Sequence, residues 1–227
     1  MELPKETSST QARHGRWYDD ACGTAFAMEL VGERWSLLIV RELMFGGRRF
    51  SDLRAALPGI SAKILSERLG AMEAAGIVRR AAHEQAPGVR LYELTEWGLR
   101  ADVAIMELGR WAAMSPRHDP TLPLSAASLM LSFRTMFDAA LAGDLRLVGQ
   151  IDVGPERFVA TVADGALGIV RGRAKEADFS FAAPVASLIA GAVYLKLPFA
   201  DLPDLAVESP TRAETFRGFF HLPAKIG

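Results

Sequence analysis

Cationic and hydrogen-bonding side chains gather in two neighbouring stretches of the chain. In the first stretch, Lys63 and Ser66 can donate hydrogen bonds and Glu67 can accept them. The second stretch, residues 77–95, carries three arginines: Arg79, Arg80 and Arg90. Ammonium and guanidinium groups neutralise phosphates, while donors and acceptors on a helix can bind the edges of bases. This pattern is typical of chemistry directed at a nucleic acid.

A helix from Ser61 to about Ala75 is expected to position the first group. Its apolar residues recur at helical spacing and predict one buried face: Leu65, Leu69 and Met72. Lys63 and Glu67 then point away from the core. Ser61 is a candidate N-cap, because a serine hydroxyl can accept a hydrogen bond from the first turn, and Gly76 is placed to end the helix.

A hairpin is expected to position the second group. Residues 77–81 and 89–95 read as two strands around the turn-forming residues Gln85 to Gly88. Thr95 then caps a single further helix that ends near Ser115. The arginines of the hairpin would lie where a wing contacts phosphates or the minor groove.

Two helical stretches precede Ser61. Residues 25–45 predict one or two helices, ended by Gly46 and Gly47, and residues 50–57 predict a short helix with Ser51 as its candidate cap. Three helices followed by a hairpin are the order of a winged helix-turn-helix, whose third helix enters the major groove. The predicted DNA contacts are Arg48, Arg49, Ser61, Lys63, Ser66, Glu67, Arg68, Arg79, Arg80 and Arg90.

The composition sets limits on the class of protein. Half of the 227 residues are hydrophobic and the net charge is -1, so DNA affinity must come from how charge is distributed. Residues 46–100 contain nine Lys and Arg against six Asp and Glu. A single cysteine, a polar N-terminus and the lack of a long apolar run predict a cytoplasmic protein without a membrane partner.

The chain is expected to hold two domains. Residues 1–19 read as a flexible tail, 20–115 as the winged helix-turn-helix, 116–124 as a linker with three prolines, and 125–227 as a second domain. That second domain predicts a helix at 126–141, strands at 145–153, 157–163, 166–172 and 178–181, a helix at 185–193, a short strand at 205–208 and a helix at 212–220. The fold class is therefore α+β.

The N-terminal half resembles a known family. Its ordered motifs are Cys22-Gly23, 31–35, 41–43, 50–53, 59–61, 65–69, 73–78 and 92–95, and over residues 20–113 they resemble the HxlR-type transcriptional regulators. The resemblance implies a homodimer, with terminal helices at the dimer interface and two recognition helices on a pseudo-palindromic site. It also makes Cys22 a candidate redox sensor, the alternative being a small structural residue, although Gly23 replaces the proline usual after it.

The C-terminal half resembles domains of the sterol carrier protein type over residues 125–225. Such domains enclose an apolar cavity, and the candidate lining residues are Phe133, Phe137, Phe179, Phe181, Leu188 and Val193. The alternative is that these six residues are ordinary core. The resemblance implies an apolar small-molecule effector.

The sequence carries no recognisable signature of catalysis or of metal binding. The four histidines are scattered, and no nucleophile elbow, phosphate-binding glycine loop or metal-ligand spacing is present, which predicts no metal and no cofactor. The leading interpretation is a DNA-binding transcriptional regulator modulated by an apolar small molecule. The alternative is a small-molecule or lipid carrier whose N-terminal domain mainly dimerises, and an enzyme comes third.

Overall fold

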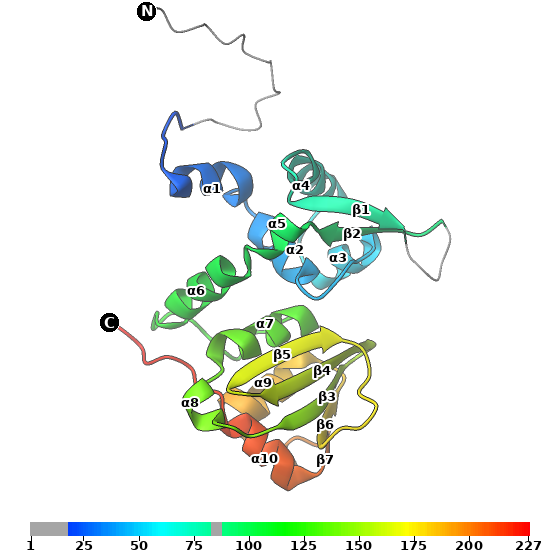
Figure 1. Cartoon of the computed structure of the whole chain (residues 1–227), viewed down its shortest axis with the longest axis vertical. Helices are drawn as coiled ribbons and strands as arrows, with labels where there is room; N and C mark the ends of the chain where they lie inside the picture. The colour runs from blue at the N-terminus through cyan, green and yellow to red at the C-terminus, as the bar shows by residue number, and fades with distance from the viewer. Residues whose placement is uncertain (1–17, 83–87) are drawn as a thin grey trace, which may run out of the picture.

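The computed structural model describes residues 18–82 and 88–227, arranged as an N-terminal and a C-terminal unit (Figure 1). The tail up to residue 17 and the turn residues Gln85 to Pro87 lie outside the described residues. The N-terminal unit contains α1 (Gly23–Val31), α2 (Ser36–Leu43), α3 (Phe50–Ala56), α4 (Ala62–Ala74), β1 (Val78–Ala82), β2 (Arg90–Leu94), α5 (Glu96–Leu99) and α6 (Asp102–Ala113).

The C-terminal unit is built on a five-stranded sheet. Its elements are α7 (Ala126–Met136), α8 (Ala139–Ala142), β3 (Leu147–Val153), β4 (Glu156–Ala163), β5 (Ala166–Arg171), β6 (Phe179–Ala183), α9 (Ala186–Tyr194), the short 3-10 helix η1 (Phe199–Asp201), β7 (Ala206–Glu208) and α10 (Pro210–Gly218). The predicted strands are present in the predicted order with boundaries shifted by a few residues, but the single helix predicted at 126–141 is divided into α7 and α8, because Phe137 between them is extended. Residues 115–125 join the two units without a helix or strand.

The helix that carries Lys63 forms as its sequence predicts. The Ser61 hydroxyl accepts a hydrogen bond of 3.2 Å from the backbone N–H of Ile64 and so caps α4. The three apolar residues of the predicted face, Leu65, Leu69 and Met72, are at most 1% exposed. Gly76 follows α4 with a φ of +77°, a conformation that glycine adopts without strain.

One predicted cap and the length of one predicted helix need correction. Ser51 lies inside α3, and Arg49 occupies the N-cap position without a side-chain cap. Thr95 does cap a helix, since its Oγ1 accepts from the N–H of Gly98 at 3.0 Å, but that helix ends at Leu99 and α6 begins separately at Asp102. A Cβ on Gly98 would come within 2.2 Å of a backbone oxygen at the start of the hairpin, so this short helix packs closely against it.

The sheet of the C-terminal unit has the strand order β5-β4-β3-β6-β7, with β3 and β6 parallel and the other pairs antiparallel. Along β3 every second residue is buried, because successive side chains point to opposite faces. One face is therefore apolar, and α7, α9 and α10 pack against it (Figure 1).

The six residues expected to line an apolar cavity are part of this core. Phe133, Phe179, Phe181 and Val193 are at most 1% exposed, while Phe137 and Leu188 are partly buried against the same core. The Phe133 ring packs against three other aromatic rings: Tyr194, Phe216 and Phe220. The alternative interpretation of these residues, as ordinary packing, fits their contacts.

A buried carboxylate joins the two units. Glu42, at the end of α2, is fully buried and accepts hydrogen bonds from Arg41, from Arg48 at 3.1 Å and from the Ser125 hydroxyl at 2.6 Å. Arg48 also donates to Glu156 of the C-terminal unit at 3.1 Å. These contacts satisfy a charge that would be costly to bury alone.

Aromatic and ionic contacts flank this carboxylate. Phe45 packs edge-on against Phe158 of β4, with ring centroids 5.9 Å apart. In the last turn of α7, Arg134 forms an ion pair of 2.9 Å with Asp102 of α6. The two units thus share one continuous core. The helices within the described ranges are all too short or too polar to cross a bilayer.

Candidate nucleic-acid interface

The outer face of α4 presents its polar residues to solvent. The Lys63 side chain is 84% exposed, and its Nζ lies 3.9 Å from a carboxylate oxygen of Glu67 one turn later. Ser66 is exposed between them. An exposed pair at this distance contributes little stability, so both side chains remain available to other partners. A helix with this face is narrow enough to enter the major groove, which is about 12 Å wide.

The arginines of the hairpin lie on its two opposite faces. Arg80 of β1 lies opposite Tyr92 of β2 in the strand register. Two residues farther along β1, Ala82 lies opposite Arg90. Because side chains alternate along a strand, Arg80 and Arg90 share one face of the hairpin. Arg80 stacks over the Tyr92 ring at 5.6 Å and forms an ion pair of 3.1 Å with Glu73 of α4. This face is therefore on the α4 side.

Arg79 points to the opposite face. It is bonded to Glu93 at 2.6 Å, directly across the strands. Together these two side chains line a hollow whose other wall includes Ile169 and Val170 of β5. The face of the hairpin that carries Arg79 is turned toward the C-terminal unit, so the structure does not bring Arg79 together with Lys63.

Arg48 is also separated from the expected surface. Its side chain is 10% exposed, and its two terminal nitrogens bind Glu42 and Glu156 on opposite sides. A guanidinium held this way joins the two units and is not free to bind a phosphate. The expectation that Arg48 contacts DNA is corrected accordingly. The sequence gives no sign of this role, because Glu156 lies 108 residues away.

The remaining expected cations differ in exposure. Arg49 is exposed at the start of α3. Arg68 is 22% exposed and donates to Glu33 at 3.0 Å, which ties α4 to the segment after α1.

Arg54, which is not among the predicted contacts, is exposed on α3. The helical spacing that places Leu53 in the core turns Arg54 outward, so the same facial argument applied to α3 would have found it.

Comparison with known proteins identifies the family of this chain. The model of HxlR-like helix-turn-helix proteins matches residues 30–119. The uncharacterized HTH-type transcriptional regulator YvaP of Bacillus subtilis is 38% identical over 86 residues, which cover 38% of this chain and 80% of YvaP. The chain belongs to the HxlR family.

Further relatives of this HxlR-family chain carry similar descriptions. The HTH-type transcriptional regulator YodB of Bacillus subtilis is 38% identical over 86 residues, covering 38% of this chain and 77% of YodB. The solved structure of YodB in its reduced form is 35% identical, with a TM-score of 0.39, and covers 43% of this chain and 98% of that one. The HxlR-family chain is thus a DNA-binding transcriptional regulator of the helix-turn-helix type with a winged N-terminal unit.

The single cysteine of this HxlR-family protein lies at the start of α1. Cys22 is exposed and occupies the N-cap position. Backbone N–H groups of Ala25 and Thr24 hold the pKa of its thiol below the usual value, because they stabilise the thiolate. Within the described part of the chain, no cluster of three or more His, Cys, Asp or Glu side chains could hold a metal ion.

Proposed function

We propose that this protein binds a specific duplex through α4 in the major groove and through the Arg80 and Arg90 face of the hairpin. The observation that supports the proposal is the exposure of Lys63, Ser66 and Glu67 on α4, to which the Arg80–Glu73 ion pair joins the arginine face of the hairpin, in a chain of a DNA-binding family. Lys63 and Ser66 donate to bases or phosphates, and Glu67 accepts from a cytosine amine. Arg49 and Arg54 on α3 supply backbone contacts.

The working unit is a homodimer. Helix α1 has no buried residue, and α6 buries only Ala113 while leaving three large apolar side chains exposed: Val103, Leu108 and Trp111. A second copy of the chain can cover these helices. Two recognition helices on one face of B-DNA must lie about 34 to 36 Å apart, a spacing that two-fold symmetry provides.

An apolar small molecule modulates DNA binding through the C-terminal unit. What supports this part of the proposal is the direct contact between that unit and α2 and α6, described above for Glu42 and Asp102. The likeness of the C-terminal unit to sterol carrier domains remains a prediction from the sequence. The carrier alternative loses its support, since the residues expected to line a carrier cavity pack against one another.

Binding to a selected duplex tests the proposal. The full chain is used to select an operator from random duplexes, and affinity is then measured by fluorescence anisotropy at several salt concentrations. Affinity should fall steeply as salt rises, because neutralised phosphates release counterions. Arg90→Ala should weaken binding and lower the salt slope by about one, the loss expected for one phosphate contact.

Arg79→Ala provides the matched control. Both arginines lie on the same hairpin, but Arg79 is on the face turned toward the C-terminal unit. Its removal should leave operator affinity within about twofold, well below the effect of a lost phosphate contact. Equal losses from both variants, or none from either, would contradict the assigned face. Selection of no preferred sequence would contradict the proposal of specific binding.

A further inference from the structure

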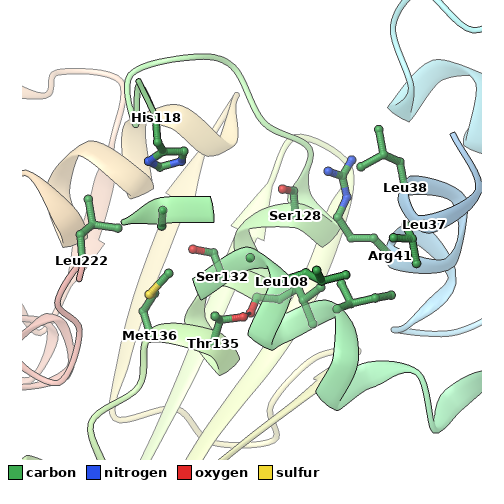
Figure 2. A pocket seen from close by; sticks show the side chains of 14 residues that line it. Leu37, Leu38, Arg41, Leu108, His118, Ser128, Ser132, Thr135, Met136 and Leu222 are labelled. Carbon is green, nitrogen blue, oxygen red and sulfur yellow. Dashed lines mark hydrogen bonds between the residues drawn. The ribbon is translucent and has the colours of Figure 1, made fainter. Parts of the chain in front are cut away.

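A cavity of about 360 Å³ lies between the two units. Figure 2 shows its walls, which come from α2, α6 and α7. Most of the lining is apolar, with Leu37 and Leu38 on α2, Ile105 and Leu108 on α6, and Met136 on α7. This volume is at the lower end of the range of ligand pockets, roughly 300 to 1,000 Å³. The cavity therefore suits a small molecule of one ring with a short chain.

The polar side chains of the cavity are one arginine, one histidine and three hydroxyl-bearing residues, Ser128, Ser132 and Thr135. Arg41 lines the cavity from α2 and Ser132 from α7 (Figure 2). The Ser132 hydroxyl shares a hydrogen bond of 2.7 Å with the buried phenol of Tyr194. His118 lies at the other end, with its Nδ1 3.5 Å from Nζ of Lys225. None of the described residues that line the cavity is acidic.

The charge around Arg41 is incompletely balanced. Arg41 donates to Glu42 through Nε and Nη2, which leaves Nη1 uncommitted among the described residues. Glu42 also accepts from Arg48, and the network continues through Glu156 to Arg171, so three arginines share two carboxylates. Nη1 of Arg41 can therefore donate a charge-assisted hydrogen bond to an anion in the cavity.

We propose that the cavity binds a small apolar carboxylate as the effector of this regulator. Its carboxylate accepts a charge-assisted hydrogen bond from Arg41, and its apolar body fills the space between α6 and α7. The regulatory half of this inference rests on the proposed DNA-binding function. The binding half does not, and it can be measured without DNA.

The position of the cavity explains how a ligand would act on DNA affinity. Its walls are held together on one flank by the Glu42–Ser125 contact and on the other by the Asp102–Arg134 pair. Helix α6 carries the proposed dimer surface, so a ligand that shifts α6 against α7 changes the spacing of two recognition helices. Such coupling is reciprocal, because the operator then changes ligand affinity by the same factor.

Three probes of the same length and apolar body test the binding half. Phenylbutyrate, phenylbutanol and phenylbutylamine carry a carboxylate, a hydroxyl and an ammonium group at the same position. Each is titrated into the full-length protein by isothermal calorimetry. Phenylbutyrate should bind about tenfold more tightly than phenylbutanol, as one charge-assisted hydrogen bond predicts, and phenylbutylamine should bind most weakly.

Gly109→Leu locates the site. Gly109 is a cavity-lining residue of α6, and a Cβ built on it meets no atom within 4 Å, so a leucine can be introduced at this wall without an immediate clash. This variant should lose phenylbutyrate binding while keeping its helical circular dichroism and its sedimentation coefficient. Gly218→Leu is the matched control, because Gly218 is an exposed helical glycine of α10 with equal space around it, outside the cavity. It should bind like the parent protein.

Arg41→Gln separates charge from shape. Loss of the guanidinium should abolish the preference for phenylbutyrate over phenylbutanol, while phenylbutanol binding shows that the cavity is intact. Unchanged phenylbutyrate binding in Gly109→Leu, or no binding of any probe to the parent protein, would overturn the inference. So would partner side chains filling the cavity in a crystal structure of the dimer.

Operator binding measured with and without phenylbutyrate tests the regulatory half. A change of about 5- to 150-fold is expected, and it should disappear in Gly109→Leu. Probe binding without any change in operator affinity would overturn the regulatory half and leave the binding site standing. Failure of the ligand-free protein to bind any operator would instead contradict the proposed function, with the calorimetric result unaffected.

Discussion

Apolar helices of the two units are covered to very different degrees. In the C-terminal unit, α7 buries eight of its eleven residues and α9 six of its nine. In the N-terminal unit, α1 buries none of its nine residues and α6 one of twelve. All four helices are rich in apolar residues. The C-terminal unit completes its own core, whereas α1 and α6 leave large apolar side chains exposed in the single chain, among them Met28, Val103, Leu108 and Trp111.

This difference distinguishes residues that stabilise the fold from residues that the proposed dimer would bury. Burial of apolar surface drives both folding and association. Exposed apolar residues standing singly are normal, but one helix without a buried residue and a second one with a single buried residue support the proposed contact surface. Substitutions in the two sets of helices should therefore change different measured quantities.

Phe133→Ala should have the largest effect on the free energy of unfolding. Phe133 is fully buried on α7 and contacts three aromatic rings, so its removal leaves a cavity that neighbouring side chains can fill only in part. We expect a loss of about 3 to 5 kcal/mol. Urea denaturation followed by circular dichroism measures it.

Phe133→Leu is the companion variant and should lose clearly less, because most of the apolar volume remains. A loss below about 1 kcal/mol for Phe133→Ala would mean that α7 is not packed as described.

Glu42→Gln should have an intermediate effect. The substitution keeps the shape of the side chain but removes the charge that balances Arg41 and Arg48. The free energy of unfolding should fall by about 1 to 3 kcal/mol, because buried donors lose their charged acceptor. Thermal unfolding should also become less cooperative, since this residue joins the two units through Ser125.

Glu214→Gln is the control for this prediction. Glu214 also pairs with an arginine, Arg217, but it is about half exposed. Surface ion pairs contribute about 0 to 1 kcal/mol, so its loss should be small. Equal effects of the two substitutions would show that burial of Glu42 does not matter to the joining of the units.

Local signals made most of the secondary structure predictable. The Ser61 cap, the Gly76 stop and the apolar spacing of α4 act within a few residues, and the structure follows them. The break between α5 and α6 has no such local signal in the apolar spacing of residues 96–113. The sequence of a short helix does not single out one cap residue, which is why Ser51 was expected at the N-cap of α3 where Arg49 lies.

The candidate site was predictable where it depends on one helix face or one strand pair. Exposure of Lys63, Ser66 and Glu67 follows from helical periodicity alone. The role of Arg48 does not, because its partner Glu156 is brought close only by the packing of two units. The cavity beside Arg41 likewise arises from helices far apart in the sequence. The apolar residues expected to line a cavity belong to the core that the sheet forms with its covering helices, or pack against that core.

Val103→Asp should have the smallest effect on the stability of the single chain and a large effect on assembly. Val103 is 60% exposed on α6, so a charged replacement buries nothing new in the monomer and should change its stability by less than about 0.5 kcal/mol. In a dimer the same carboxylate would be desolvated without a partner. The parent protein should melt at a higher temperature as its concentration rises, because association stabilises the folded state, and the variant should not.

Val170→Asp on β5 is the matched control, since Val170 is 62% exposed and lies outside α1 and α6. Sedimentation velocity should give a dimer for the parent and for Val170→Asp and a monomer for Val103→Asp. A monomeric parent protein at micromolar concentration, with and without operator DNA, would mean that the exposed apolar residues of α6 do not serve self-association.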